Sequence, residues 1–203
     1  MNELELIERI RKTQPPPSPL LRAGIGEDAS VIAFGEKELL VTCDCLVEGV
    51  HFKRRWGSWE DWGKKAAGSA LSDIAAMGGT VLFAWVDLHL PKNFKEQDLS
   101  AFYKGLYSFF IPLKISLAGG NLSQNPKGLS ASLTLLGERP AGSKMLRSDA
   151  RPGDFLFLAG SPGFAGLGLS LLKKKQKEVN RYTQAFLHPQ PQLMLGRWLR
   201  ENQ

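Results

Sequence analysis

The stretch from Trp59 to Met77 limits most strongly how this chain can fold. Ser58 stands before it as a helix cap, and Gly78 and Gly79 follow it as a stop signal, so the spacing predicts one helix. The second half of the stretch is rich in Ala, Gly and Ser. Small side chains allow a neighbouring backbone, or a ligand, to come close. We therefore expect a close neighbour along this helix.

The remaining apolar patterns predict a mixture of strands and helices. Strands are expected over Ala29–Phe34, Leu39–Cys43, Val81–Leu90, Lys114–Ala118, Leu129–Glu138 and Phe155–Ala159. Further helices are expected over Glu3–Lys12, over Lys95–Phe110, from Gly168 to the lysine run, and over Pro191–Glu201. The first two strands flank a glycine turn and form a hairpin, and Lys114–Ala118 is expected to be buried and followed by a loop at Gly119–Asn121. Irregular alternation of this kind favours an α+β fold with a mixed sheet.

Charge and composition argue against several classes of function. The net charge of +6 invites a nucleic-acid interpretation, but residues 1–143 hold 16 basic and 16 acidic residues, so the excess lies in the last sixty. No zinc-finger spacing or aromatic RNA-binding signature accompanies that excess. No apolar run of membrane-spanning length and no signal-peptide core is present. Cys43 and Cys45 are too close for a good structural disulfide, which favours a reducing cytoplasm.

Several familiar motifs are absent or out of context. Gly24 to Ala29 matches the dinucleotide pattern G-x-G-x-x-A, but it follows a proline-rich segment instead of a strand and opens no helix. The chain has no Walker A loop and no G-x-S-x-G elbow. Any nucleotide chemistry is therefore of another type than that of the P-loop enzymes.

Short acidic residues at the ends of expected elements are the remaining candidates for chemistry. Asp28 lies in a glycine turn, Asp44 lies near a strand end, and Asp73 lies near the carboxyl end of the small-residue helix. A carboxylate in that last position is disfavoured by the helix dipole unless a cation compensates it. Taken singly, each aspartate is better explained as a cap or a surface charge than as a ligand, since Asp favours turns and caps. Taken together, they are the oxygen ligands that Mg²⁺ prefers beside substrate phosphates.

Five segments in order carry a resemblance to a known family. They are Gly24–Ala29, Thr42–Phe52 with the sequence Val-Glu-Gly-Val-His-Phe, Leu71–Gly79 with Ser-Asp-Ile-Ala-Ala-Met-Gly-Gly, Ala118–Asn121, and Arg147–Asp154. Over essentially the whole chain this pattern resembles the thiamine-monophosphate kinases. That family belongs to an ATP-binding group that includes aminoimidazole ribonucleotide synthetase, selenophosphate synthetase and the hydrogenase maturation factor HypE.

The resemblance implies an activity and a set of site residues. It implies transfer of a phosphoryl group from ATP to thiamine monophosphate, giving thiamine diphosphate, with several Mg²⁺ ions and no phosphoenzyme. It implies metal ligands at Asp28, Thr42, Cys43, Asp44, Asp73 and Asn121. It implies ATP contacts from Tyr103, Gly120, Asn121 and Arg147, and a thiamine-phosphate contact from His51.

The resemblance also implies an organisation of the chain. Residues 1–139 would form an ATP- and magnesium-binding domain whose sheet pairs with that of a second subunit in a cytoplasmic homodimer, and residues 140–203 would begin a truncated α/β carboxy-terminal domain. The chain departs from the family pattern in two ways. Cys43 stands where relatives present a hydroxyl, and a thiol is a poor ligand for a hard ion. An Asp-x-Ser-Asp-Gly segment of the relatives' carboxy-terminal domain is absent from the chain.

Three alternatives stay open at this point. The same fold could serve another acceptor, as in an ATP-dependent synthetase or maturation factor. The chain could be a non-catalytic dimerisation or nucleotide-binding module, because part of the family's site is missing. A nucleic-acid binder comes third, and it would show a steep salt dependence of binding.

Overall fold

The computed structural model describes residues 2–174 and 179–202. Its sheet has the order β1-β2-β3-β6-β4-β5, with every neighbouring pair antiparallel except β4 and β5. The strands are β1 (Leu21–Ala23), β2 (Ser30–Phe34), β3 (Lys37–Val47), β4 (Thr80–Leu90), β5 (Ser116–Gln124) and β6 (Ser130–Pro140). The helices are α1 (Glu3–Thr13), α2 (Trp59–Ala76), α3 (Glu96–Leu113), α4 (Phe164–Lys173), α5 (Arg181–Leu187) and α6 (Leu193–Glu201).

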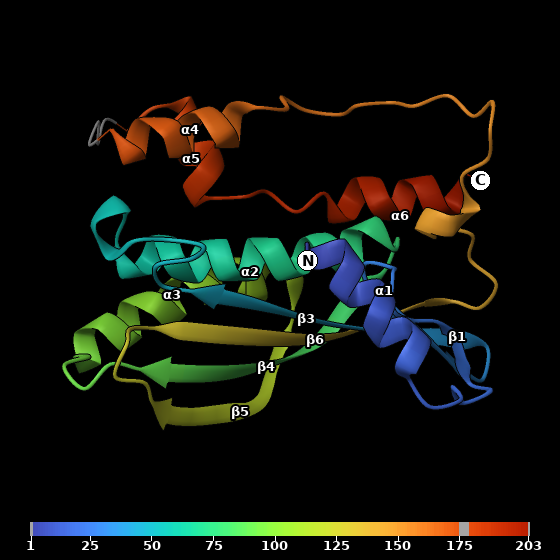
Figure 1. Cartoon of the computed structure of the whole chain (residues 1–203), viewed down its shortest axis with the longest axis horizontal. Coiled ribbons are helices and arrows are strands. Elements are labelled where there is room, and N and C mark those ends of the chain that lie inside the picture. The colour runs from blue at the N-terminus through green and yellow to red at the C-terminus, as the bar shows by residue number, and fades with distance from the viewer. Residues whose placement is uncertain (1, 175–178, 203) are drawn as a thin grey trace.

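The molecule is layered, with α2 in the middle. Figure 1 shows the sheet below α2 and the helices α4, α5 and α6 above it. The helix α2 touches β3 and β6 of the sheet and also α3, α5 and α6. Mixed pairing and this packing confirm the expected α+β class.

The two faces of the sheet differ because side chains alternate along each strand. On β3, Leu40 and Leu46 are buried, whereas Cys43 and Cys45 are exposed. On β4, Val86 and Leu88 are buried on either side of the half-buried Asp87. The buried face packs against the helices, and we call the other one the open face. Each residue of β3 or β4 is thereby assigned to one face.

The small residues of α2 do bring neighbouring backbones close. A Cβ atom built on Gly63 would lie 2.0 Å from the carbonyl oxygen of Phe102, and one on Gly105 of α3 would lie 2.1 Å from that of Glu60. A Cβ atom on Gly68 would lie 2.4 Å from the carbonyl oxygen of Pro189. No side chain larger than hydrogen fits at these crossings, so the expected close approach is confirmed.

Arginines from distant segments occupy the carboxyl end of α2. The Nη1 atom of Arg139 donates to the carbonyl oxygen of Met77 at 2.9 Å, and Nη1 of Arg200 donates to that of Gly78 at 2.7 Å. Arg139 also forms a buried ion pair with Glu38, its Nε lying 2.8 Å from Oε2. Cations at this end stabilise the last carbonyls of the helix, which have no partner within it, and they oppose the helix dipole. No basic residue of α2 itself supplies that charge in its last turn.

Three sequence-based expectations are wrong. Phe155–Ala159 is not a strand: Leu156 is 97% exposed, and no neighbouring strand supplies hydrogen bonds there within the described chain. The strand expected over Lys114–Ala118 is β5, which is exposed throughout because it is the sheet edge beside β4. The loop expected at Gly119–Asn121 lies inside β5, in register with β4.

Helix boundaries were predicted more closely. The helices expected at Glu3, Trp59 and Lys95 are present within a few residues of the expected bounds, and Ser58 caps α2 by accepting a hydrogen bond from the backbone N–H of Asp61. The helix α5 was not predicted; it begins where Asn180 accepts hydrogen bonds from two backbone N–H groups. No helix of the described chain is long and apolar enough to cross a membrane.

The crossing of α2 and α3 gives a stability prediction with an internal control. Gly105→Ala should lower the free energy of unfolding by about 1–3 kcal/mol, because the new methyl group forces the two backbones apart. Gly166 lies in α4 with nothing within 4 Å of a built Cβ, so Gly166→Ala should raise the free energy of unfolding by roughly 0.5–1 kcal/mol. Urea unfolding measures both values. A destabilisation of the same size at both positions would contradict the packing described here.

Candidate active site

Two oxygen side chains of β3 face α2 and meet an aspartate there. Thr42 and Asp44 fall at every second position between the buried residues Leu40 and Leu46, so they share the helix face of the sheet with them. The hydroxyl of Thr42 donates to Oδ2 of Asp73 on α2 at 2.6 Å. This hydrogen bond joins the sheet to the helix at the centre of the candidate site.

The electrostatics of Asp73 place two further carboxylates nearby. Burial raises the pKa of Asp73, and the negative charges of Asp44 and Asp28 raise it further. The hydrogen bond from Thr42 and the positive charge of Arg147 act in the opposite direction and lower the pKa. The charges of Asp44 and Asp28 thus act on Asp73, and a cation between these carboxylates would favour the ionised form of Asp73.

Arg147 closes one side of this cluster. It lies in a short 3₁₀ helix, η2 (Arg147–Asp149), and its guanidinium pairs with the carboxylate of Asp28, with Nε 3.2 Å from Oδ2. The backbone N–H of Arg147 donates to Oε2 of Glu27 at 2.7 Å, which anchors the segment to the turn before β2. The hydrogen bond to Asp28, together with the charge of that carboxylate, raises the pKa of Arg147, so the side chain stays cationic.

The donor set suits a hard divalent cation. Carboxylate and hydroxyl oxygens are the ligands that Mg²⁺ takes, and Mg²⁺ commonly completes its shell with waters and substrate phosphates. Among residues 2–174 and 179–202, no three Asp, Glu, His or Cys side chains already converge as a metal centre. The arrangement therefore fits an ion that arrives with a phosphate ligand better than a permanently chelated ion.

A cavity of about 340 Å³ adjoins this cluster at the end of β3. Its lining includes Asp44, His51, Lys65 and Phe186. The backbone N–H of Val47 donates to Nδ1 of His51 at 2.9 Å. A neutral ring in this arrangement carries its proton on Nε2, where it can donate to a ligand. Burial lowers the pKa of Lys65, and the charge of Asp44 opposes that shift.

Comparison with known proteins identifies the family. The model of the AIR synthase related protein, N-terminal domain, matches residues 26–138. The chain belongs to the AIR synthase related family. This match confirms the expected aminoimidazole ribonucleotide synthetase-like amino-terminal domain.

Relatives within the family are named thiamine-monophosphate kinase. The protein of that name from Bacillus subtilis is 36% identical over 205 residues, which cover 97% of this chain and 62% of the relative. The one from Aquifex aeolicus is 34% identical over 188 residues, covering 92% of this chain and 58% of the relative. The chain thus spans about three fifths of the length of these relatives. These similarities confirm the resemblance seen in the sequence.

Solved structures agree with these sequence matches. A structure described as AaThiL complexed with AMPPCP and TMP has a TM-score of 0.86 and 31% identity, and covers 98% of this chain and 62% of that one. The hydrogenase maturation protein HypE has a TM-score of 0.57 at 20% identity, covering 86% of this chain and 51% of the other, so that likeness concerns the fold alone.

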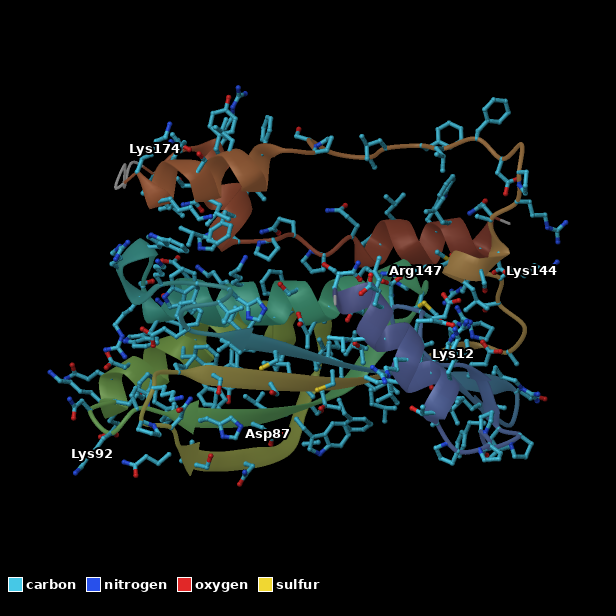
Figure 2. All side chains as sticks on the ribbon, in the orientation of Figure 1. Lys12, Asp87, Lys92, Lys144, Arg147 and Lys174 are labelled. Carbon is cyan, nitrogen blue, oxygen red and sulfur yellow. The ribbon has the colours of Figure 1, made fainter. Side chains whose placement is uncertain are left out.

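The structure does not bring every expected site residue to the cluster. The thiol of Cys43 lies on the open face, because its neighbours Thr42 and Asp44 face α2. Asn121 pairs in register with Asp87 and therefore shares the open face with it. Figure 2 labels Asp87 beside β4, well separated from Arg147.

Tyr103 and Gly120 also lie apart from the carboxylates. Tyr103 is on α3 and lines an open groove of about 710 Å³ that holds none of the three aspartates. Burial raises the pKa of its hydroxyl, and neighbouring Tyr107 adds to that shift. Gly120 lies in β5, where a built Cβ would come within 2.0 Å of the carbonyl oxygen of Val86. Its lack of a side chain is thus required by strand pairing within this chain.

Sequence reasoning missed Lys65 and Glu27. A signal for Lys65 was present, because this charged residue precedes the small-residue half of α2 and lies on the same helix as Asp73. Glu27 carried no such signal, since its contact with the backbone of Arg147 joins segments 120 residues apart.

Asp73 gives a prediction in which stability and binding change in opposite directions. Because the folded state raises the pKa of Asp73, its ionisation lowers stability above that pKa. Asp73→Asn, which keeps an oxygen that can accept from Thr42, should therefore raise the melting temperature by a few degrees at neutral pH without divalent cations. The gain should shrink as the pH falls toward the ordinary aspartate value of about 3.9.

The same variant should bind Mg²⁺ with ATP at least about 10-fold more weakly, since ligand-shell changes cost 10- to 100-fold. Thermal scans between pH 4 and 8 and calorimetry with Mg²⁺ and an ATP analogue check the two effects. Glu96→Gln removes an exposed carboxylate from the first turn of α3 and serves as the matched control. If Asp73→Asn is no more stable than the wild type at pH 7 and binds Mg²⁺ with the ATP analogue equally well, Asp73 is not part of the site.

Proposed function

We propose that this protein phosphorylates thiamine monophosphate to thiamine diphosphate, using ATP and Mg²⁺. The observation that carries the proposal is that Asp73 accepts a hydrogen bond from Thr42 and interacts through its charge with Asp44, Asp28 and Arg147. Relatives of this chain are named for that reaction, and a similar solved structure was described in complex with AMPPCP and TMP. AMPPCP is an ATP analogue, which supports a nucleotide as the phosphoryl donor.

The oxygen cluster supplies what phosphoryl transfer needs. The reaction requires in-line positioning and neutralisation of charge, and little covalent help from the protein. Asp28, Thr42, Asp44 and Asp73 would hold Mg²⁺, which supplies neutralisation of the triphosphate when bound. Arg147 would add a cationic donor on the same side, as its pairing with Asp28 suggests. Transfer is direct, because the proposed mechanism uses no protein nucleophile.

His51 is proposed to contact the acceptor. It shares a cavity with Asp44, so an acceptor bound there would lie beside the proposed magnesium site. The Nε2–H group of its neutral ring is available as a donor, because Nδ1 already accepts from Val47. An oxygen of the acceptor is a suitable partner for that donor.

A homodimer is proposed from the open face of the sheet. Asn121 lies on that face and Tyr103 lies in a groove without aspartates, so neither side chain joins the carboxylates of its own chain. The open face carries an apolar row in register across three strands, formed by Val41, Leu136 and Phe83, with Phe83 41% exposed. We propose that this face pairs with the same face of a second copy, and that residues 1–139 form the pairing domain.

Residues 140–203 are proposed to begin a second domain, as in the longer relatives. Their helices α5 and α6 pack on α2, so this segment also covers the first domain. The cytoplasm remains the proposed location, because Cys43 and Cys45 are free thiols at the surface.

A direct assay tests the proposed reaction. The chain incubated with ATP, Mg²⁺ and thiamine monophosphate should form thiamine diphosphate, detected by chromatography, whereas other phosphoryl acceptors should give no product. EDTA should abolish the product, because the carboxylate cluster cannot neutralise a triphosphate without a divalent cation. Binding of an ATP analogue with Mg²⁺, but no product from any acceptor, would instead support a non-catalytic nucleotide-binding module.

The proposed pairing surface has its own test. Phe83→Glu places a charge in the apolar row of the open face and should shift sedimentation from dimer to monomer. Met194→Glu is the control, because Met194 is 78% exposed on α6, away from the sheet. A wild-type chain that sediments as a monomer at high micromolar concentration would reject the open face as a dimer interface.

A further inference from the structure

The cavity beside Asp44 contains one cationic side chain to which the site described above assigns no role. Its walls come from the end of β3, from α2 and from the helices α4 and α5, and Leu169 and Phe186 close it from the carboxy-terminal side. Among the described lining residues, Lys65 is the only lysine or arginine. The cavity thus holds a cation opposite the proposed metal ligand Asp44 and the proposed acceptor contact His51.

The ammonium group of Lys65 is held in place by α5. Its Nζ atom donates to the carbonyl oxygen of Phe186 at 2.8 Å and lies 4.0 Å from the centre of the Phe186 ring. A lysine ammonium has three N–H donors, and the contact with Phe186 is its one hydrogen bond to the described chain. Two donors therefore remain for a ligand in the cavity. Held by a carbonyl and a ring face, the group is already oriented before a ligand arrives.

The chemistry of the proposed reaction requires such a cation. The acceptor is itself a phosphate, so its attacking oxygen must approach a triphosphate that carries the same sign of charge. Metal ions held by the carboxylates would neutralise the donor side, but the acceptor phosphate also needs a positive partner. Apolar walls at Leu133, Leu169 and Phe186 reduce the screening of that partner by water.

We propose, resting on the proposed function, that Lys65 binds the phosphate group of the acceptor and holds it toward the magnesium site. Lys65 keeps its proton in this role and takes no part in bond making or breaking. It determines which acceptors are used, because an acceptor without a phosphate gains nothing from the ammonium. His51, which lines the same cavity, donates one hydrogen bond, and Lys65 supplies the charge.

Binding measurements with paired ligands and paired variants test this proposal. Thiamine monophosphate and thiamine are each titrated calorimetrically into the chain in the presence of Mg²⁺ and a non-hydrolysable ATP analogue. The wild type should bind thiamine monophosphate more tightly than thiamine. Lys65→Gln keeps an N–H donor for the carbonyl oxygen of Phe186 but loses the charge, and it should weaken binding of thiamine monophosphate by about 10- to 100-fold. Its affinity for thiamine and for the ATP analogue should stay unchanged.

Two further variants separate charge from packing. Lys65→Arg keeps the charge and should retain more affinity for thiamine monophosphate than Lys65→Gln does. Lys92→Gln removes a surface charge from the segment after β4, which Figure 2 shows pointing away from the molecule, and it should bind both acceptors as the wild type does. If Lys65→Gln fails to fold, the comparison of Lys65→Arg with the wild type for the two acceptors carries the test.

Several outcomes would overturn the proposal. Equal loss of affinity for thiamine monophosphate and thiamine in Lys65→Gln would mean that Lys65 only supports α5. A wild type that binds thiamine monophosphate and thiamine with equal affinity would show that no cation recognises the phosphate group. If the wild type forms thiamine diphosphate and Lys65→Gln binds thiamine monophosphate normally, the role of Lys65 is rejected and the kinase function stands. If the wild type binds ATP analogue but no thiamine monophosphate, the kinase function itself is rejected.

Discussion

Close backbone contact around α2 is the constraint on which the rest of the structure depends. Glycines at the crossings with α3 and with the segment at Pro189 leave no room for a side chain, so the position of α2 is fixed from two sides. Gly196 of α6 repeats this arrangement, since a built Cβ would lie 2.0 Å from the carbonyl oxygen of Ala75. A helix held in this way can present Lys65 and Asp73 at fixed places.

The carboxylates of the site impose an electrostatic cost that the fold compensates locally. Asp73 lies near the carboxyl end of α2, where the helix dipole adds to the repulsion from Asp44 and Asp28. Arg139 and Arg200 bind the last carbonyls of that helix, and Arg147 pairs with Asp28. The remaining strain between like charges is what a bound cation would relieve, as is common at functional sites.

The sequence predicted the features that depend on local chemistry. Ser58, the small residues of α2 and the paired glycines after it specify a capped helix with close neighbours, and the structure has one. The grouping of Asp28, Asp44 and Asp73 followed from a resemblance between ordered motifs, because single aspartates in turns are common. Features that depend on distant pairing were not predictable in this way. Phe155–Ala159 has the composition of a strand, but a strand needs a partner, and composition does not supply one.

Alternation along β3 explains why the expected metal ligands divide into two groups. Thr42 and Asp44 face the helix layer, so Cys43 between them must face the other way. Asn121 follows the same rule through its register with Asp87. Side chains on opposite faces of one sheet cannot share an ion, because the backbone lies between them. Pairing of open faces would place these side chains between the two sheets, so the positions on the open face can join the helix-side site of their own chain only through backbone atoms.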